Sequence, residues 1–336
     1  MQIHLNKLRF YARHGVWPQE TAVGAPFTVS LTLVVDDDTC ADALLHDRLE
    51  GTVDYARVYE VVRREMAEPS QLIERVAHRL ATAVLREFVV VREVGVEVAK
   101  LSPPIAGFDG DGVSVSLTMR RRLYVFDFDG TLADTRAGIV ATMQATFAHH
   151  GLPLPPQARI VPTIGLPLTA SIGLLLRGQG MAESEADVMA GQLTETYRRL
   201  FEEVGVERVT LFDGVAGWLQ RLHSEGCLLT IATSRGHLST DQLCRRLGIR
   251  SLIGDIVACD DVTHAKPHPE AVLRLMQRYG CEASDTIVVG DTTFDIEMGR
   301  SAGCRTVGVT WGNHTAEQLN RAAATSLMTP AMLARQ

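Results

Sequence analysis

The sequence has few cysteines, no surplus of positive charge and no long apolar run. Its six cysteines are spread over 336 residues without a C-x-x-C pair, which argues against a disulfide framework and a zinc site. The net charge of −7 offers no basic surface to a nucleic acid. No apolar run approaches the roughly 20 residues that span a bilayer, and no secretion signal opens the chain. We therefore expect a reduced, cytoplasmic protein without nucleic-acid or membrane partners.

The length and patterning of the chain indicate two domains. A chain of 336 residues has room for roughly two domains of ordinary size. We expect the first at residues 1–121 and the second at 122–336, because the character of the sequence changes at the joint Thr118–Arg122. The three arginines of this joint, Arg120 to Arg122, are expected to be solvated surface.

Apolar periodicity predicts the elements of the first domain. Strands are expected around residues 3–11, 27–35, 94–98 and 113–117, and helices over 55–66 and 72–88. Pro69 breaks the first helix, and Ser70 is expected to cap the amino terminus of the second. The resulting order, β-β-α-α-β-β, favours an antiparallel sheet with both helices on one face. Such a thin layer leaves two open sheet edges, which assembly into an oligomer can close.

Several spaced segments of this domain resemble dihydroneopterin aldolase, an enzyme of the folate pathway. They are Phe10-Tyr-Ala-Arg-His-Gly-Val16, Glu20, Thr52-Val-Asp-Tyr55, Leu72-Ile-Glu-Arg-Val-Ala77 and Lys100 followed by Pro103-Pro104-Ile105. The resemblance covers nearly the whole domain. It implies the α+β tunnelling fold, in which four β-β-α-α-β-β units close a barrel. It also implies a homo-oligomer, usually an octamer, with active sites between subunits.

The same resemblance implies the reaction and the residues that carry it out. The family cleaves 7,8-dihydroneopterin by a retro-aldol reaction to 6-hydroxymethyl-7,8-dihydropterin and glycolaldehyde. The dihydropterin ring is the electron sink, so neither a metal nor another cofactor is expected. Proton transfer is assigned to Lys100, Tyr55 and Glu20, and pterin binding to Glu74, Ile73 and Val53. The fold also hosts zinc-dependent pterin enzymes, but this domain lacks a clustered histidine set; for His14 we expect only that it shapes its loop.

The second domain opens on the stretch Leu123–Thr135, where a short apolar run predicts a buried parallel strand. Asp127 and Asp129 end this strand, and Gly130 turns the chain away. Ligands of open α/β sheets lie at the carboxyl ends of strands, so the two carboxylates can share a divalent cation. One of them can also act as a nucleophile and the other as an acid or base. The alternative is that the two acids only cap the next helix.

Further strands are expected around residues 227–234, 256–259, 286–291 and 305–309, and a mostly helical segment over 137–206. Alternating strands and helices predict a doubly wound parallel sheet. Four segments resemble the four motifs of the haloacid dehalogenase (HAD) phosphohydrolases. They are Asp127-x-Asp129, the strand end Thr233-Ser234, the pair Lys266-Pro267, and the strand end Asp291. The helical segment resembles the cap that phosphoglycolate-phosphatase-like members insert after the first strand.

This second resemblance implies a phosphatase that works through an aspartyl phosphate. Asp127 is the expected nucleophile and Asp129 the acid and base. Thr233 and Ser234 are expected to hold the phosphoryl group, and Lys266 to neutralise its charge. The expected Mg²⁺ ligands are Asp127, Asp129, Asp291 and Asp295. We predict no role for Asp134, Asp213, Ser239 or His264.

Taken together, the two resemblances predict a bifunctional enzyme of folate synthesis that acts on small pterin and phosphomonoester substrates. The phosphatase substrate expected from this pairing is dihydroneopterin monophosphate. Three alternatives remain open at this point. The second half could be a general phosphoglycolate-type phosphatase, a non-catalytic assembly module for the aldolase, or a phosphomutase.

Overall fold

The computed structural model describes residues 1–35, 37–49 and 51–335, which divide into two compact units. The first unit contains Met1–Arg122 together with the short segments Leu222–Cys227 and Tyr279–Cys281. The second contains the other described residues from Leu123 onward. Within the described ranges, no helix is both long and apolar enough to cross a membrane.

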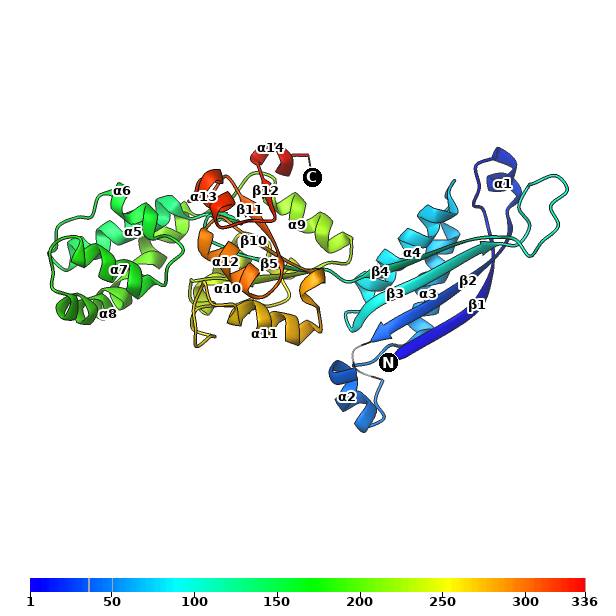
Figure 1. Ribbon diagram of the computed structural model, residues 1–336, viewed down its shortest axis with the longest axis horizontal. Coiled ribbons are helices and arrows are strands. Elements are labelled where there is room, and N and C mark those ends of the chain that lie inside the picture. Colours follow the sequence, from blue (N-terminus) through cyan, green and yellow to red (C-terminus); the bar gives the residue numbers. More distant parts are fainter. Residues whose placement is uncertain (36, 50, 336) are drawn as a thin grey trace. The chain divides into compact units, whose positions relative to one another are not determined.

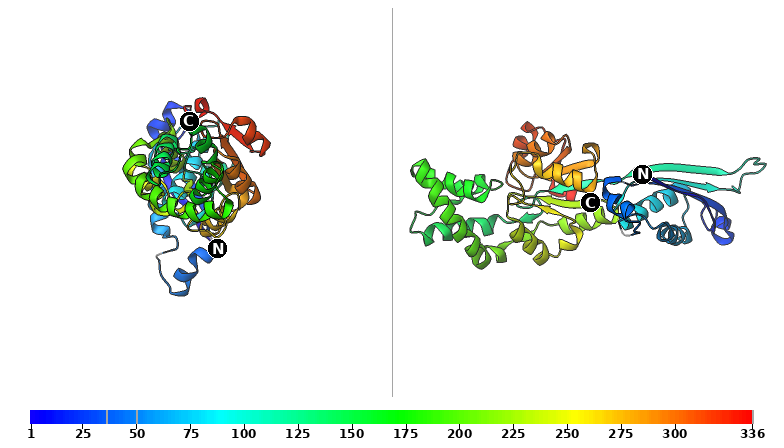
Figure 2. Two further views of the ribbon diagram at one scale, coloured as in Figure 1. Left: turned by 90° about the vertical axis from the view of Figure 1, so that its left-hand side faces the viewer. Right: turned by 90° about the horizontal axis from the view of Figure 1, so that it is seen from below.

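The first unit is built on a four-stranded antiparallel sheet in the order β1-β2-β3-β4. The strands are β1 Gln2–Ala12, β2 Ala25–Val35, β3 Val91–Lys100 and β4 Val113–Arg120. Helices α3 Tyr55–Ala67 and α4 Ile73–Glu87 lie together on one face of this sheet, α3 against β1 and α4 against β3 and β4 (Figures 1 and 2). Alternate side chains of β2, from Phe27 to Val35, are buried against the helices. The predicted antiparallel sheet is confirmed.

Two short helices of the first unit, α1 Pro18–Val23 and α2 Asp37–Leu45, were not expected from periodicity. The sequence of α1 nevertheless contains its starting signals, because Pro18 is its first residue and Glu20 reaches back to the amide of Trp17 at 2.9 Å. Apolar periodicity misses such a helix, because it is only six residues long and buries none of them.

The expected role of Ser70 as a helix cap is wrong. Leu72 is the N-cap of α4, whereas the carbonyl of Ser70 accepts a hydrogen bond from the amide of Gly15 at 2.9 Å. The Ser70 hydroxyl accepts another from Arg79 Nη1, also at 2.9 Å. Ser70 therefore ties the loop before α4 to the loop after β1, a tertiary role that helix-start statistics do not register.

The expectation that Arg121 is solvated surface is also wrong. Its guanidinium is buried and donates to the backbone carbonyls of Leu85, Phe88 and Val91 at 2.5, 2.7 and 2.9 Å. Carbonyls at the end of a helix have no partner within the helix, so a buried arginine can satisfy several of them at once. Burial lowers the pKa of Arg121 to about 10, and the group remains charged at neutral pH.

The second unit contains a six-stranded parallel sheet in the order β12-β11-β10-β5-β8-β9. Its strands are β5 Leu123–Phe126, β8 Leu228–Ala232, β9 Ile256–Val257, β10 Thr286–Gly290, β11 Arg305–Val309 and β12 Ser326–Met328. The connecting and flanking helices are α9 Val215–Ser224, α10 His237–Arg246, α11 Glu270–Tyr279, α12 Thr293–Ser301, α13 Ala316–Arg321 and α14 Pro330–Leu333. The predicted parallel sheet is confirmed, and the three-residue edge strand β12 is the one the apolar pattern did not reveal.

A separate group of helices follows β5 in the same unit. It comprises α5 Arg136–His149, α6 Gln157–Ile160, α7 Leu168–Arg177 and α8 Glu183–Leu200, drawn in green beyond one end of the sheet (Figures 1 and 2). A π-helical turn, Phe201–Gly205, continues α8 and packs on α5. This packing is close, because a Cβ atom on Gly138 would lie 2.7 Å from the carbonyl oxygen of Gly205. The antiparallel pair β6 Ala133–Asp134 and β7 Thr210–Leu211 brackets the segment at its two ends.

The strand order of the parallel sheet brings distant parts of the sequence to one edge. Strand β5 lies between β10 and β8, so the residues after their carboxyl ends are neighbours. These residues are Asp127 after β5, Thr233 after β8 and Asp291 after β10. The sheet therefore gathers three of the sequence motifs where open α/β sheets place their ligands.

Candidate active sites

Lys266 lies between two buried carboxylates at this edge of the sheet. Its Nζ atom donates to Asp127 Oδ1 and to Asp295 Oδ1, each at 2.6 Å. The other oxygen of Asp295 accepts hydrogen bonds from the amide and hydroxyl of Thr292 at 3.0 and 2.7 Å. Asp295 thus caps α12 and holds Lys266 at the same time. The ammonium group is fixed beside Asp127 by a partner from the first turn of α12.

Asp291 forms the third corner of this carboxylate group. Its Oδ1 atom accepts from the Thr131 hydroxyl at 3.1 Å, and its Oδ2 atom accepts from the amide and side-chain nitrogens of Asn313 at 2.6 and 2.9 Å. Gly130 has a φ of +95°, and a Cβ atom there would collide with the Asp291 carboxylate. A glycine is therefore needed for the turn and for the close approach of the backbone to Asp291.

The carboxylates of Asp127, Asp291 and Asp295 lie so close together that their ligand oxygens fall within 4.8 Å of one another. Burial, with a contribution from the neighbouring carboxylates, raises the pKa of Asp127 well above its usual range and that of Asp291 to about 7. Burial alone would lower the pKa of Lys266, but Asp127 and Asp295 outweigh it and raise that pKa. Buried negative charge with one ammonium group beside it fits a further cation, and oxygen ligands suit Mg²⁺.

The side chain of Asp129 is held by a residue that the motif analysis did not single out. Arg235 Nη2 and Nε donate to the Asp129 carboxylate at 2.7 and 3.1 Å. The same guanidinium donates to Ser239 Oγ at 3.2 Å, and its central carbon lies 4.5 Å from the centre of the Phe201 ring. Sequence reasoning could have noted Arg235 as the basic residue directly after Thr233-Ser234, but its carboxylate partner is 106 positions away.

In the first unit, the end of β3 places the buried Lys100 beside two groups from the β1–α1 region. Its Nζ atom donates to the carbonyl of His14 at 3.0 Å and to the carboxylate of Glu20. Although burial opposes this, hydrogen bonds from Lys100 and from the Trp17 amide lower the pKa of Glu20. The predicted neighbours Lys100 and Glu20 are therefore together in one chain, as an ion pair.

His14 contributes to this site through its backbone and its packing. The imidazole is fully buried and lies edge-on to the Phe27 ring, with centroids 5.2 Å apart. Neither ring nitrogen has a hydrogen-bond partner among the described residues. Burial, together with the nearby charges of Arg79 and Lys100, lowers the pKa of His14 to about 4. The ring is therefore neutral at physiological pH.

The other predicted aldolase residues are not joined to Lys100 within the described chain. Tyr55, the first residue of α3, is 68% exposed, and no hydrogen bond, ion pair or ring contact links it to Lys100. Glu74 is exposed at the start of α4, next to the half-buried Ile73. Val53 is buried before α3. Within the described chain, the residues expected to act together are therefore not all in contact with one another.

Comparison with known families agrees with both halves. Residues 124–309, more than half of the chain, match the family model of haloacid dehalogenase-like hydrolases. The chain belongs to the haloacid dehalogenase-like hydrolases. Residues 3–118 match the family model of dihydroneopterin aldolase. This HAD hydrolase therefore also carries an aldolase domain, so it combines a lyase with a phosphoric monoester hydrolase.

Individual relatives of the HAD hydrolase half are phosphatases. The probable phosphatase IndB of Dickeya dadantii is 37% identical over 202 residues, which cover 60% of this chain and 86% of the relative. Phosphoglycolate phosphatase of Salmonella typhimurium is 29% identical over 209 residues, with 58% and 83% covered. A solved hydrolase from Pseudomonas syringae superposes with a TM-score of 0.55 and 26% identity, covering 63% of this chain and 95% of its own.

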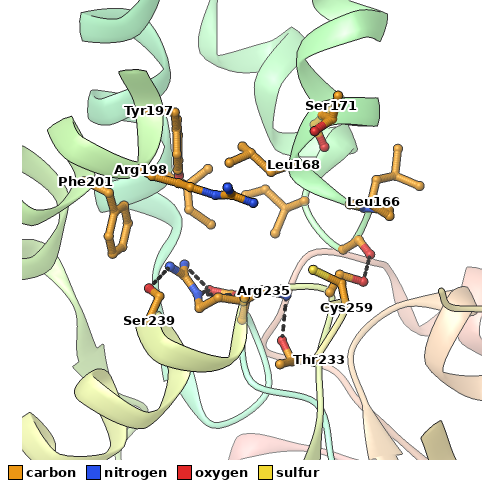
Figure 3. Close-up of a pocket in the computed structure, with 18 of the residues that line it drawn as sticks. Leu166, Leu168, Ser171, Tyr197, Arg198, Phe201, Thr233, Arg235, Ser239 and Cys259 are labelled. Carbon is orange, nitrogen blue, oxygen red and sulfur yellow. Dashed lines mark hydrogen bonds and ion pairs between the residues drawn. The ribbon is translucent and has the colours of Figure 1, made fainter. Parts of the chain in front are cut away.

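The carboxylate centre of the HAD hydrolase opens into a cavity of about 740 Å³ (Figure 3). Asp127, Asp129, Thr233 and Ser234 all line it. The Ser234 hydroxyl donates to the carbonyl of Gly165 at 2.7 Å, which ties the floor of the cavity to the helical group. Ser239, for which the sequence predicted no role, also lines the cavity. The cavity is thus shared between the sheet edge and helices α5, α7 and α8.

Proposed function

We propose that the chain is a bifunctional enzyme of folate synthesis. Its HAD half hydrolyses dihydroneopterin monophosphate, and its aldolase half cleaves the dihydroneopterin that is released. The observation that carries this proposal is the presence in one chain of two assembled centres, Lys266 with Asp127 and Lys100 with Glu20. The aldolase family uses the unphosphorylated pterin, so a phosphate monoester must be hydrolysed before the carbon–carbon bond is cleaved.

In the phosphatase step, the Asp127 carboxylate attacks phosphorus while the bond to the leaving oxygen breaks. Asp129 gives that oxygen a proton, so the alcohol leaves and an aspartyl phosphate remains. Asp129 then takes a proton from water, whose oxygen attacks the same phosphorus and frees Asp127. The hydroxyl of Thr233 and the amide of Ser234 would bind phosphoryl oxygens. Catalysis by fixed charges and donors suits phosphoryl transfer.

We propose that Mg²⁺ is held by Asp127 and Asp291, with Asp129 and Asp295 beside it. When bound, it supplies positive charge to the phosphoryl oxygens. Asp295 also orients Lys266, because its two oxygens are already engaged by Lys266 and Thr292. We further propose that residues 137–206 act as a cap over the cavity and that their side chains select the leaving group.

In the aldolase step, the side-chain hydroxyl of dihydroneopterin loses its proton to a base that Lys100 and Glu20 provide. The adjacent carbon–carbon bond breaks, its electrons pass into the dihydropterin ring, and glycolaldehyde leaves. Tyr55 protonates the resulting enol-like carbon. Glu74 would accept two N–H groups of the pterin, assisted by the backbone of Ile73 and Val53.

The aldolase half is proposed to assemble into a ring-shaped oligomer, most simply an octamer. Strands β1 and β4 are the edges of the sheet within one chain, and pairing between chains would close them. Assembly would also allow Tyr55 of one copy to meet Lys100 of another. Light scattering on the purified chain tests this, and a monomer with full aldolase activity would refute it.

The proposed function is tested by supplying dihydroneopterin monophosphate with Mg²⁺ and following both products. The wild type should release phosphate and then 6-hydroxymethyl-7,8-dihydropterin. Asp127→Asn should form neither product, and adding free dihydroneopterin should restore the pterin product. Lys100→Ala should release phosphate but accumulate dihydroneopterin. Pterin product from the monophosphate in Asp127→Asn would refute the order of the two steps.

A phosphoglycolate-type phosphatase is the second candidate for the HAD half. The observation in its favour is the 29% identity to the Salmonella enzyme of that name. In this case, the two halves would be fused without a shared pathway. The two candidates differ in the size and charge of the leaving group, which the cavity must accommodate.

A further inference from the structure

The walls of the phosphatase cavity are mainly apolar. Only its floor, with Asp127, Asp129 and Thr233, belongs to the expected phosphoryl site. The remaining space is lined largely by apolar side chains, including Ile139, Met143, Leu166, Leu168, Tyr197 and Phe201. Tyr197 and Phe201 lie on one side, and Leu166 and Leu168 lie across from them (Figure 3). A volume of about 740 Å³ is large for a two-carbon acid but is in the range of sites that enclose ring-bearing ligands.

The charged side chains of the described lining do not favour a second anion. Its carboxylates are Asp127, Asp129, Glu202 and Asp260, and its basic side chains are Arg198 and Arg235. The Arg235 side chain is largely buried, and it already donates to the Asp129 carboxylate at 2.7 Å. Releasing Arg235 to a substrate carboxylate would leave Asp129 buried without its partner, which is unfavourable.

Arg198 is the second cation, and it too has acidic neighbours. It donates to Glu195 at 2.7 Å, on the exposed side of α8. Its guanidinium extends over the cavity (Figure 3), where Glu202 also contributes to the lining. Asp260, also in the lining, accepts from the amide of His237 at 2.9 Å. The outer cavity therefore has at least as much negative as positive charge.

We propose that this cavity selects phosphomonoesters whose leaving group is uncharged and carries a ring, and that it rejects those with a second anionic group. An apolar ring gains free energy by leaving water for these walls. A carboxylate placed against these walls would lose its hydration, and it would have to compete with Glu195 for Arg198 and with Asp129 for Arg235. This inference rests on the phosphomonoester hydrolysis proposed above, but not on the pterin as the physiological substrate.

A matched pair of synthetic probes tests the inference. Benzyl phosphate and 4-(phosphonooxymethyl)benzoate have the same scissile bond and differ by one ring carboxylate. We expect kcat/KM for benzyl phosphate to exceed that for the carboxylated probe at least tenfold, mainly through KM. We also expect kcat/KM for benzyl phosphate to exceed kcat/KM for methyl phosphate, which lacks the ring. Equal values within either pair, or preference for the carboxylated probe, would overturn the inference.

Two variants on α7 locate the selection in the cavity. Leu168→Lys adds a cation to the lining. It should reduce the ratio of kcat/KM for benzyl phosphate to kcat/KM for the carboxylated probe at least fivefold. Leu174→Lys adds the same charge on an exposed position of α7 outside the lining and should leave the preference unchanged. An equal effect of both variants would contradict a local role. If Leu168→Lys does not fold, as judged by circular dichroism, the wild-type probe ratios still decide the inference.

The outcomes separate this inference from the proposed pterin substrate. Selection for benzyl phosphate without hydrolysis of dihydroneopterin monophosphate would leave the inference standing and remove the pterin. Hydrolysis of dihydroneopterin monophosphate with equal kcat/KM for the two benzyl probes would keep the pterin substrate and overturn the inference about the cavity. No phosphate release from any probe in the presence of Mg²⁺ would overturn both.

Discussion

Arg235 donates hydrogen bonds to the carboxylate of Asp129 from two nitrogen atoms, Nη2 at 2.7 Å and Nε at 3.1 Å. The Asp129 carboxylate is thereby held outside the close group formed by the carboxylates of Asp127, Asp291 and Asp295, although Asp129 is only two residues from Asp127. The two side chains are only 9% and 13% exposed, so breaking the ion pair would leave a largely buried charge without its partner, which is unfavourable. The position of the proposed acid and base is therefore set by a residue outside the Asp-x-Asp motif.

Asp127→Asn should abolish phosphate release, with a loss of at least about a thousandfold in kcat, because the substitution keeps the shape and removes the nucleophilic charge. Aldolase activity of the same preparation should be unchanged. Asp134→Asn provides the control, since it neutralises an exposed acid a few residues further along the chain. Wild-type phosphate release by Asp127→Asn would exclude the aspartyl phosphate.

Asp291→Asn should raise the Mg²⁺ concentration that gives half-maximal phosphatase activity by about tenfold or more, since a buried carboxylate is lost from the proposed metal site. Titration of activity with Mg²⁺ measures this change. Glu297→Gln, on the exposed side of α12, should leave the titration midpoint where it is. An unaltered midpoint in Asp291→Asn would remove this residue from the metal site.

Lys100→Ala should lose aldolase turnover and keep pterin binding, because the amine is proposed to move a proton and not to hold the ring. Glu74→Ala should show the opposite pattern, with binding lost. Fluorescence of bound pterin and the rate of glycolaldehyde formation separate the two effects. Glu60→Gln changes an exposed acid of α3 and should alter neither quantity. Full turnover in Lys100→Ala would contradict the assignment.

The stability of the aldolase domain should fall in mild acid because of His14. Its pKa is 6.5 in the unfolded chain and about 4 in the folded one, so the unfolded state binds the proton more readily. The contribution is fully present above pH 6.5 and is lost as the pH falls towards 4. Between pH 7 and pH 5 the loss should be about 2 kcal/mol.

Hydrogen exchange of the β2 and β3 amides measures this change locally. The variant His14→Gln cannot take up the proton. Between pH 7 and pH 5, the free energy of opening measured at these amides should therefore fall by about 2 kcal/mol less in the variant than in the wild type. Acids such as Glu20 titrate in both proteins, and the difference between the two proteins isolates His14. Identical pH dependence in the variant and the wild type would show that the His14 ring does not titrate between pH 7 and 5.

The local signals of the sequence were sufficient for the four-stranded sheet and for all strands of the parallel sheet except β12. An apolar run that ends in acids marks the strand and the ligand edge together, so Asp127 and Asp291 could be placed from the sequence. The order of the parallel strands then brings Asp127 and Asp291 together, whereas the place of Lys266 beside Asp127 was expected from the resemblance to HAD phosphohydrolases. Which of these residues perform the chemistry stays a prediction until the variants are measured.

Other features depend on contacts between distant residues, and no local pattern encodes them. The partner of Arg235, the burial of Arg121 under the end of α4 and the pairing of Ser70 with Gly15 are of this kind. The separation of Tyr55 from Lys100 is another, because residues of one family motif need not meet within a single chain. Sequence spacing predicts which residues belong to a site more readily than which of them lie together within one chain.

Whether the HAD half hydrolyses a pterin monophosphate can be decided by a single comparison of two substrates. It is the ratio of kcat/KM for dihydroneopterin monophosphate to that for phosphoglycolate, determined on the same wild-type preparation with saturating Mg²⁺. We predict that the pterin monophosphate is preferred by at least about tenfold, equivalent to about 1.4 kcal/mol of transition-state discrimination. A preference of about tenfold for phosphoglycolate would contradict the account and support a phosphoglycolate-type phosphatase.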